Sequence, residues 1–381
     1  MTDTSPFSDV QTPVFILDIG RLQKNLAVAA RIRRESGARI LLATKAFAMP
    51  AAFPYMRPHL DGTTASGVHE ARLGATEFGR DVHVYSPAYT DEGLQELAGI
   101  ASDIYFNSAE QLARFGPAAR GMGAWIGLRI NPGYSNATLG GALYDPCAPY
   151  SRFGEVAGRL GEIDWTAVDT LHVHALCESL HDGSVGLIEH MAEHFADQIE
   201  QVSAVNFGGG HFINKAGYDV DALIAGIQAF RDRFGVEVIL EPGAGLVVGA
   251  GELHASVIGL HENDKSIAIL DVSASTHMPD VLEAPYRPEI EGAGDADAQA
   301  HSYILAGNTC MTGDVIGEYS FAEPLTPGDE LIFSDQMHYS FVKANTFNGT
   351  PLANLAIRHE DGTVETVSDF GYDAFRERLG R

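Results

Sequence analysis

The chain has 381 residues, of which 45% are hydrophobic and 20% are charged, a composition typical of a folded globular protein rather than a disordered or fibrous one. Acidic residues outnumber basic ones by 51 to 25, and the formal net charge of −26 argues against nucleic acid or an anionic membrane as a partner and suits a small cationic substrate. No apolar run approaches the roughly 20 residues of a membrane span, and the polar N-terminus lacks the apolar segment of a signal peptide. Because the three cysteines also form no disulfide or metal spacing, we expect a cytoplasmic protein without a membrane or metal partner.

Short apolar or β-branched runs alternate with amphipathic segments through the first 240 residues. A strand at Val14–Asp18 is followed by eight more predicted strands: Ile40–Thr44, Gly62–Thr64, Val82–Tyr85, Ile104–Phe106, Trp125–Ile130, Thr170–His174, Ala204–Phe207 and Glu237–Leu240. Helices are predicted at Ile19–Ser36, Val68–Phe78, Glu92–Ile100, Ser108–Phe115, Val185–Gln198 and Val220–Phe234. Ser108, Ser184 and Asp219 are predicted to cap three of them.

Beyond about residue 250 the pattern changes to strand-like pieces separated by Gly, Pro and Asp turns. These pieces are LHASVIGL, SIAILDV, DELIFSD and LANLAIRH, with a polar loop at 289–300 and one short helix at Asp373–Leu379. Eight strands joined by helices are the pattern of a (β/α)8 barrel. We therefore predict an α/β fold, a TIM-type barrel at residues 20–250 followed by a mostly β C-terminal domain formed by residues 1–19 and 251–381.

In such a barrel the active site lies at the carboxyl ends of the strands. The polar and glycine residues that follow the predicted strands are Lys45, Asn107, Asn131, His174, Gly208–Gly210 and Glu241. Lys45 is one of only five lysines and the only one that closes an apolar run, ILLATK. A partly desolvated lysine there is suited to form a Schiff base with a carbonyl compound such as pyridoxal phosphate. The alternative is an ordinary lysine that reaches from a strand end into water.

Three further strand-end residues suit the same cofactor. Gly208–Gly210 would let backbone N–H groups approach a phosphate, although a glycine run also makes a tight turn. Glu241 could hold a pyridine nitrogen in its protonated form. His174 could stack on the ring, or be a hydrogen-bonded core histidine.

The spacing of His172 and His174 supports a rival interpretation, because an HxH pair on one strand is a ligand pattern of metal-dependent barrel hydrolases. We favour it less, since those hydrolases carry the pair on the first strand, whereas here it is on the sixth. In the second domain, Cys310 lies in a polar, glycine-rich setting, GNTCMTGD, that favours an exposed, reactive thiol over an inert buried one.

Taken in order, these residues resemble the fold-type III pyridoxal-phosphate decarboxylases of the alanine racemase-like group. The matching stretches are TKAF around Lys45, LDGTTASGVHE, FGGG at 207–210, LEPG at 240–243, and TFNG at 346–349 after Tyr339. Within the group, the sequence is similar to the carboxynorspermidine/carboxyspermidine decarboxylases in LDGTTAS, VHVYSPAY, LRINP, DPCAP, HxHxLCE, ILDVSASTHMPDVLE and GDVIG. Ala244 departs from the pattern, which has a charged residue after EPG, and this leaves the identity of the distal amine open.

The resemblance implies a decarboxylase that uses pyridoxal 5'-phosphate bound covalently by Lys45. It implies that Gly208, Gly209 and Gly210 hold the phosphate together with Tyr339, that His174 lies against the ring, and that Glu241 pairs with the ring nitrogen.

The resemblance also implies a homodimer with two shared active sites, in which Cys310 reaches the cofactor of the other subunit and returns a proton to the substrate. Asp280, Glu283 and Asp314 would bind the protonated amines of a carboxylated polyamine. Carboxyaminopropylagmatine is an alternative substrate, and a non-catalytic cofactor-binding protein is a further alternative that the second domain disfavours.

Overall fold

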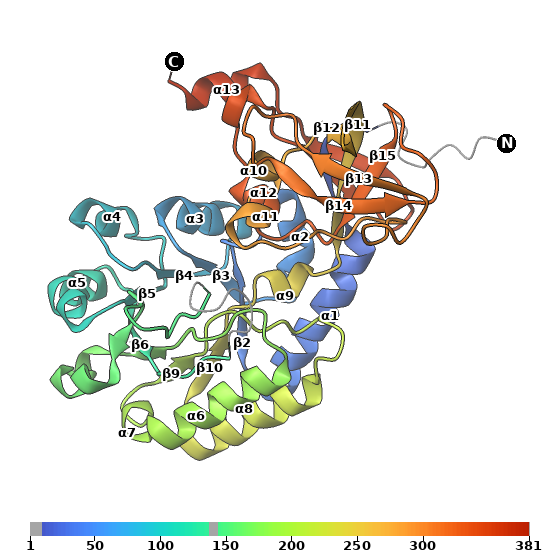
Figure 1. The fold of residues 1–381 in the computed structure, drawn as a ribbon. Coiled ribbons are helices and arrows are strands. Elements are labelled where there is room, and N and C mark those ends of the chain that lie inside the picture. The colour runs from blue at the N-terminus through green and yellow to red at the C-terminus, as the bar shows by residue number, and fades with distance from the viewer. Residues whose placement is uncertain (1–9, 137–143, 381) are drawn as a thin grey trace. The chain divides into compact units, whose positions relative to one another are not determined.

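The structure is a computed structural model that describes residues 10–136 and 144–380. The chain divides into two compact units, one formed by Gln23–Leu246 and the other by Met1–Leu22 with Val247–Arg381 (Figure 1). The sequence predicts domain boundaries at 19/20 and 250/251, whereas the compact units divide at 22/23 and 246/247. Residues 1–9 and Arg381, which belong to the predicted β-rich domain, lie outside the described residues.

The unit Gln23–Leu246 is built on a closed barrel of eight parallel strands. They are β2 (Arg39–Ala43), β3 (Gly62–Ala65), β4 (Asp81–Tyr85), β5 (Asp103–Phe106), β6 (Trp125–Asn131), β8 (Thr170–His172), β9 (Ala204–Asn206) and β10 (Glu237–Leu240). Neighbours pair in the order β5-β4-β3-β2-β10-β9-β8-β6, and β5 also pairs with β6, which closes the ring. A two-residue strand, β7 (Glu155–Val156), extends the end of β6. The predicted barrel is confirmed.

Helices lie between most of these strands. They are α1 (Ile19–Ser36), α2 (Phe53–Met56), α3 (Val68–Leu73), α4 (Asp91–Glu96), α5 (Ala109–Gly121), α6 (His181–His194), α7 (Ala196–Ile199), α8 (Val220–Phe234) and α9 (Ala244–Val247). Ser108 and Asp219 cap α5 and α8 as predicted, each side chain accepting a hydrogen bond from a first-turn amide. Ser184 does not cap a helix. It lies inside α6, where its hydroxyl donates to the Leu180 carbonyl and accepts from Tyr218.

The barrel interior is not wholly apolar. The apolar part of its core includes Leu41, Ala204 and Ile239 on three adjacent strands. Next to it, the ring of Tyr105 is fully buried, and a Cβ at Gly127 on the neighbouring strand would lie 1.9 Å from that ring. Glycine at 127 is therefore what leaves room for a tyrosine inside the barrel.

The other unit is a mostly β structure, as predicted. Its strands are β1 (Val14–Asp18), β11 (Gly251–Asn263), β12 (Lys265–Leu270), β13 (His301–Ala306), β14 (Val315–Phe321), β15 (Glu330–Ser334), β16 (Asn354–Arg358) and β17 (Val364–Ser368). They pair in the order β14-β13-β12-β11-β1-β16-β17, with β15 also on β11. Its short helices are α10 (Ala274–His277), α11 (Asp280–Glu283), α12 (Ser340–Lys343) and α13 (Tyr372–Arg378).

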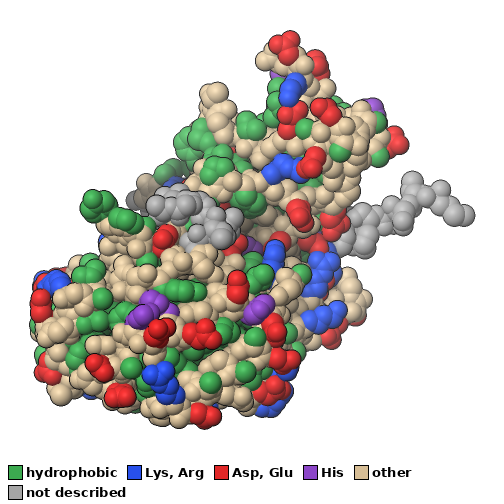
Figure 2. All heavy atoms as spheres, turned by 60° about the horizontal axis from the view of Figure 1, so that its bottom comes forward, with side chains coloured by type: hydrophobic (Ala, Val, Ile, Leu, Met, Phe, Trp, Pro, Cys, Tyr) green, Lys and Arg blue, Asp and Glu red, His purple; other side chains and the backbone are tan. Residues whose placement is uncertain are grey.

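The chain has an excess of acidic residues. On the face drawn in Figure 2 the Asp and Glu side chains are scattered, with Lys and Arg among them, and do not form one continuous acidic patch. Among the described residues, no helix combines the length and the apolar character that crossing a membrane requires.

Candidate active site

Lys45 lies two residues beyond the end of β2, at the carboxyl end of the barrel strands. The preceding residue, Thr44, fixes the backbone there, because its amide donates to the Thr64 carbonyl oxygen at 3.1 Å. Burial lowers the pKa of the Lys45 ammonium, the charge of Arg129 lowers it further, and Glu241 opposes the shift. The residue nevertheless keeps an exposed surface, so its side chain can be reached by a small molecule. Such an amine is a ready nucleophile toward a carbonyl group.

Glu241 follows β10 directly and is 4% exposed. Asn206 donates a hydrogen bond from Nδ2 to Glu241 Oε1 at 2.7 Å, and Nε2 of His172 lies 3.5 Å from Oε2. Burial alone would raise the pKa of the Glu241 carboxyl, but the contacts with His172 and Asn206 outweigh it and lower the pKa to about 2. The side chain is therefore a buried carboxylate at neutral pH, able to stabilise a positive charge placed against its second oxygen.

His174 lies two residues beyond β8, which ends at His172, so the predicted strand is two residues too long. The chain leaves the ladder because the His174 carbonyl accepts a hydrogen bond from Arg129 at 3.0 Å and the ring Nδ1 accepts one from the Gly209 amide at 3.2 Å. Burial, followed by the charges of Lys45 and Arg129, lowers the pKa of the imidazole well below its usual value. The ring is neutral at pH 7.

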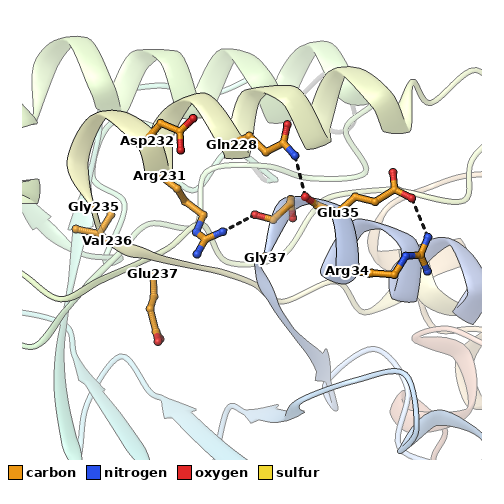
Figure 3. A pocket seen from close by; sticks show the side chains of 10 residues that line it. Arg34, Glu35, Gly37, Gln228, Arg231, Asp232, Gly235, Val236 and Glu237 are labelled. Carbon is orange, nitrogen blue, oxygen red and sulfur yellow. Dashed lines mark hydrogen bonds and ion pairs between the residues drawn. The ribbon is translucent and has the colours of Figure 1, made fainter.

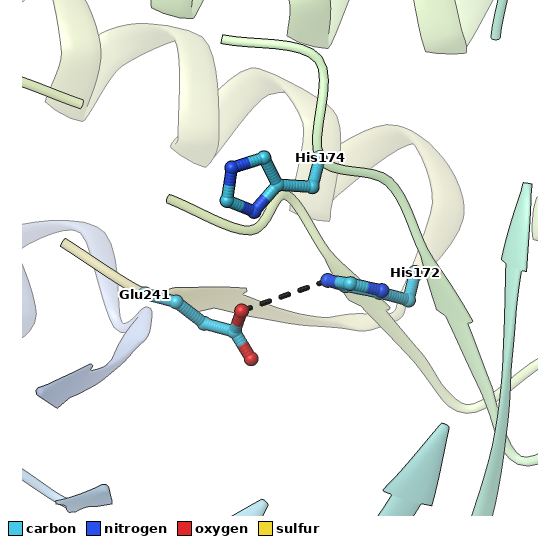
Figure 4. Close-up of side chains that lie close together, drawn as sticks. All are labelled: His172, His174 and Glu241. Atoms are coloured by element: carbon cyan, nitrogen blue, oxygen red, sulfur yellow. Dashed lines mark ion pairs between the residues drawn. The ribbon is translucent and has the colours of Figure 1, made fainter. Parts of the chain in front are cut away.

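His172, His174 and Glu241 form a cluster in which one nitrogen or oxygen atom of each side chain lies within 4.8 Å of those of the other two (Figure 4). This is the cluster that the metal-hydrolase interpretation requires. The His174 Nδ1 and Glu241 Oε1 atoms, however, already accept hydrogen bonds from Gly209 and Asn206. The two rings also meet nearly edge to face, at an interplanar angle of 73°. The cluster is better described as a set of oriented polar groups than as a prepared metal site.

Gly208–Gly210 follow β9 and pass close to two neighbouring backbone segments. Gly208 and Gly210 have φ values of +65° and +86°, a region that favours glycine. A Cβ at Gly208 would lie 2.6 Å from the Val173 carbonyl oxygen, and one at Gly210 would lie 2.3 Å from that of Leu176. The turn therefore has room for backbone but not for side chains. A loop that binds a phosphate through its amide groups needs such a close approach of bare backbone.

Several residues of this site escaped the sequence analysis because they lie inside predicted strands rather than after them. Asn206 is the last residue of β9, and its Oδ1 accepts a hydrogen bond from the Gly208 amide at 2.8 Å. Arg129 lies in β6, is 5% exposed, and places its guanidinium over the ring of Tyr85 at 4.5 Å from the ring centre. A polar residue within an apolar run was the available signal, since a barrel interior admits one only where it has partners.

Cys310 and Asp314 lie in the β unit. Cys310 is exposed, and its backbone amide donates to Asn348 Oδ1 at 2.7 Å. Asp314 is 3% exposed, and its Oδ2 accepts a hydrogen bond from the Thr309 hydroxyl at 2.6 Å. Asp314 therefore holds the loop that carries Cys310.

Asp280 and Glu283 also lie in the β unit, on α11, and both carboxylates contact the ammonium of Lys343 at the end of α12. A cation of this chain thus already binds the two acids that the sequence predicts for a substrate amine. Tyr339 immediately precedes α12 and adopts a φ of +57°, a strained conformation for a tyrosine. Their roles toward substrate and cofactor stay predictions.

A hollow of about 700 Å³ lies at the amino ends of the barrel strands, opposite the strand ends that carry Lys45 and Glu241 (Figure 3). It is bordered by the end of α1, the end of α8 and the start of β10. Arg231 donates to the Ser36 carbonyl at 2.7 Å, and Gln228 donates to that of Glu35 at 2.8 Å. These polar groups cap the end of α1, which gives them a structural role. The residues that follow the carboxyl ends of the strands do not border this hollow.

Comparisons with known proteins agree with this geometry. A family profile described as pyridoxal-dependent decarboxylase, C-terminal sheet domain, matches residues 82–336. The carboxynorspermidine/carboxyspermidine decarboxylase of Campylobacter jejuni is 39% identical over 98% of this chain and 99% of its own length. The carboxyaminopropylagmatine decarboxylase of Synechocystis sp. is also 39% identical, over 98% of this chain and 96% of its own. The crystal structure of carboxynorspermidine decarboxylase from Campylobacter jejuni, complexed with norspermidine, matches with a TM-score of 0.90 at 38% identity and covers 97% of this chain and 100% of that one.

Proposed function

The chain belongs to the family of pyridoxal-dependent decarboxylases, and from this premise we propose that it removes the α-carboxylate of a carboxylated polyamine to release the corresponding polyamine. The observation that carries the proposal is the meeting, at one end of the barrel, of a lysine with a lowered pKa, a buried carboxylate and a glycine turn open only to backbone. The same three features are what pyridoxal phosphate needs for its aldehyde, its ring nitrogen and its phosphate.

The residues at the carboxyl ends of the barrel strands fit this cofactor. The Lys45 amine is surrounded by protein yet has an accessible surface, so it can meet an aldehyde. Glu241 stays ionised although it is buried, so it can pair with a protonated ring nitrogen. At Gly208 and Gly210 a side chain would collide with carbonyl oxygens, so only backbone can form this turn. The Gly208 and Gly209 amides donate to Asn206 Oδ1 and His174 Nδ1, and a bound phosphate would share or replace these two partners.

In the proposed reaction, Lys45 would hold the cofactor by its aldehyde, and the α-amine of the substrate would take its place there. The lowered pKa keeps more of the Lys45 amine unprotonated, and only that form can bond to an aldehyde carbon. Bound pyridoxal phosphate supplies an electron sink for the electron pair left when the carboxylate departs as CO₂. Glu241 keeps a proton on the ring nitrogen, and His174, which is neutral, supports the ring without adding charge. Cys310 is proposed to donate its thiol proton to the α-carbon, which completes the exchange of CO₂ for H.

The proposed substrate is a polyamine with one amino-acid end. The support is the 39% identity over nearly the whole chain to a carboxynorspermidine/carboxyspermidine decarboxylase, together with an acidic protein surface that suits a cation. We propose that Asp280, Glu283 and Asp314 bind the amines, as charge-assisted hydrogen bonds to ammonium groups are strong.

A substrate panel tests this proposal. The purified holoenzyme is incubated separately with carboxynorspermidine, carboxyspermidine, carboxyaminopropylagmatine, diaminopimelate and ornithine, and the products are identified by mass spectrometry. We expect loss of CO₂ from at least one carboxylated polyamine, with a kcat/KM at least about 100-fold above those for diaminopimelate and ornithine. If the enzyme turns over only diaminopimelate or ornithine, the proposed substrate class is wrong, but the assignment of the chain to the decarboxylase family still holds.

Carboxyaminopropylagmatine is the second candidate substrate. A decarboxylase that acts on it is as similar to this chain as the carboxynorspermidine enzyme, at 39% identity. Ala244, at the start of α9 just after the EPG motif, is uncharged and so supplies no group that would distinguish an amine from a guanidinium. The same panel separates the two candidates by their kcat/KM values.

We further propose a cytoplasmic homodimer with two shared sites. The three cysteines are free, as is usual for thiols in a reducing compartment. Mixing Lys45→Ala with Cys310→Ala subunits tests the sharing. If each site takes Lys45 from one subunit and Cys310 from the other, half the dimers will be hybrids with one intact site, and activity will return to about a quarter of the wild-type value. Activity equal to the average of the two variants would refute shared sites.

A further inference from the structure

A continuous chain of polar side chains crosses the barrel interior behind Glu241. Asn206 Nδ2 donates to Glu241 Oε1 at 2.7 Å and lies 3.1 Å from the hydroxyl oxygen of Tyr105. The Tyr105 hydroxyl lies 2.7 Å from Nδ1 of His83, and Nε2 of His83 lies 3.1 Å from Asp103 Oδ2. Tyr105, His83 and Asn206 are fully buried. The chain runs from the strand end that carries Glu241 to the amino end of β5.

The hydrogen bonds around His83 fix its tautomer. Nε2 accepts a hydrogen bond from the Arg39 guanidinium at 3.3 Å, because a guanidinium can only donate, so we assign the His83 proton to Nδ1, which donates to the Tyr105 hydroxyl oxygen. Burial lowers the pKa of His83 to about 3, so the ring is neutral and has one nitrogen that donates and one that accepts. The hydroxyl oxygen of Tyr105 has a second lone pair, which accepts from Asn206.

Arg39 and Asp103 border the far side of the His83 ring. The Arg39 NH2 group that donates to His83 Nε2 also donates to the Asp81 carboxylate at 2.6 Å, and the Asp103 carboxylate lies 3.1 Å from Nε2.

Asn206 connects two parts of the proposed site. Its Oδ1 accepts from the Gly208 amide at 2.8 Å, while its Nδ2 donates to Glu241. One amide therefore orients both the carboxylate proposed for the ring nitrogen and the first residue of the turn proposed for the phosphate. An amide could rotate and exchange its two ends. The Glu241 carboxylate can only accept and the Gly208 amide can only donate, so the two partners fix the orientation, and Tyr105 holds Nδ2 in it by accepting its second hydrogen bond.

We propose that Tyr105 is a positioning residue of the decarboxylase: held by His83, its hydroxyl orients the Asn206 amide, and through it Glu241. The proposal rests on the function proposed above for Glu241. It assigns no contact between Tyr105 and substrate or cofactor. It explains why a tyrosine hydroxyl and a histidine, both costly to bury without partners, occupy the centre of the barrel.

Tyr105→Phe removes the hydroxyl and keeps the ring. The holoenzyme variant should have a kcat about fivefold to tenfold below wild type with an unchanged KM, as expected for loss of one buried hydrogen bond that acts on the chemical step. Titration of the cofactor-free variant with pyridoxal phosphate, followed by absorbance, should give a Kd raised by about threefold or more. The matched control is Tyr319→Phe, which removes another fully buried tyrosine hydroxyl, bonded to the Pro288 carbonyl at 2.7 Å, and should leave both values unchanged.

A double-mutant cycle separates positioning from general structural damage. If Tyr105 acts through Glu241, Tyr105→Phe will cause no further loss of kcat in a Glu241→Gln background. Asn206→Ala, a second variant, should likewise cause no further loss of kcat in that background but still weaken cofactor binding, because the Gly208 contact is lost in either case.

The outcomes are distinguishable. An equal fold-loss from Tyr105→Phe with and without Glu241 would overturn the positioning role, as would wild-type kcat and cofactor affinity in Tyr105→Phe when Glu241→Gln is impaired. Wild-type kcat in Glu241→Gln itself would instead refute the function proposed for Glu241.

Discussion

Replacing Glu241 by glutamine removes one charge and keeps the shape of the side chain. The pKa of the buried carboxyl is lowered from 4.5 to about 2, so the barrel holds this group ionised through its contacts with His172 and Asn206. A buried, preorganised carboxylate of this kind can stabilise a charge that must persist through the reaction. Removing one such group typically lowers kcat by about 100-fold to 1,000-fold, which is the loss we expect.

The assay compares kcat at saturating substrate with the amount of cofactor bound, measured from its visible absorbance, so that loss of cofactor is not mistaken for loss of catalysis. Glu241→Gln should retain cofactor, because Lys45 and the glycine turn are unchanged. A variant that binds cofactor and turns over at the wild-type rate would refute the pairing of Glu241 with the ring nitrogen.

The same substitution makes a pH-dependent prediction for the cofactor-free protein. The pKa of Glu241 is lower in the folded state than in the unfolded state, so its contribution to the free energy of unfolding is present above pH 4.5 and is lost as the pH falls toward 2. Urea unfolding should show that Glu241→Gln costs more at pH 7 than at pH 3, by about 2 kcal/mol. Equal costs at the two pH values would contradict a buried, stabilised carboxylate.

Four further substitutions test other parts of the site. Lys45→Ala should abolish turnover and the visible absorbance of covalently bound cofactor, and a purified variant that keeps that absorbance would show that another residue binds it. Cys310→Ala should keep the cofactor but lower kcat by about tenfold or more, or divert the product, as expected for loss of a proton donor; unchanged steady-state kinetics would remove Cys310 from the mechanism. Gly210→Ala should weaken binding of pyridoxal phosphate by about 10-fold or more, because its Cβ would lie 2.3 Å from the Leu176 carbonyl oxygen at a φ of +86°. An unchanged Kd in an equilibrium titration would show that this turn does not bind the cofactor. Lys343→Met should tighten binding of norspermidine or spermidine, because the cation that contacts Asp280 and Glu283 is removed; calorimetry that finds weaker binding would mean that Lys343 holds the two acids in place for the amine.

Sequence patterns predicted the fold well because they follow from local physics. The eight barrel strands read as short apolar runs because parallel strands are buried on both faces, and the six predicted helices read as amphipathic because one face of each packs on the barrel. The boundaries were less certain. Thr170–His174 reads as one strand, yet β8 ends at His172 because hydrogen bonds from Arg129 and Gly209 draw His174 out of the ladder. Neither partner is near it in sequence.

Strand-end position also predicted the principal residues of the site. Lys45, Gly208–Gly210 and Glu241 each follow a strand, and the barrel brings all the strand ends to one side. Position along the chain predicted a partly desolvated Lys45, and burial does lower its pKa. It could not predict that Glu241 is ionised while buried, because that state results from His172 and Asn206 on two other strands.

The sequence by itself determined which segments form strands and helices and which chemical groups stand at the strand ends, since both depend on residues close together in the chain. Only the tertiary structure decided the electrostatic state of those groups and the partners that orient them. Asn206 and Tyr105, 101 positions apart, meet inside the barrel, and in the sequence each is one more residue of a buried strand. Burial and hydrogen bonding act through space, so a residue's environment is known only when the chain has closed around it.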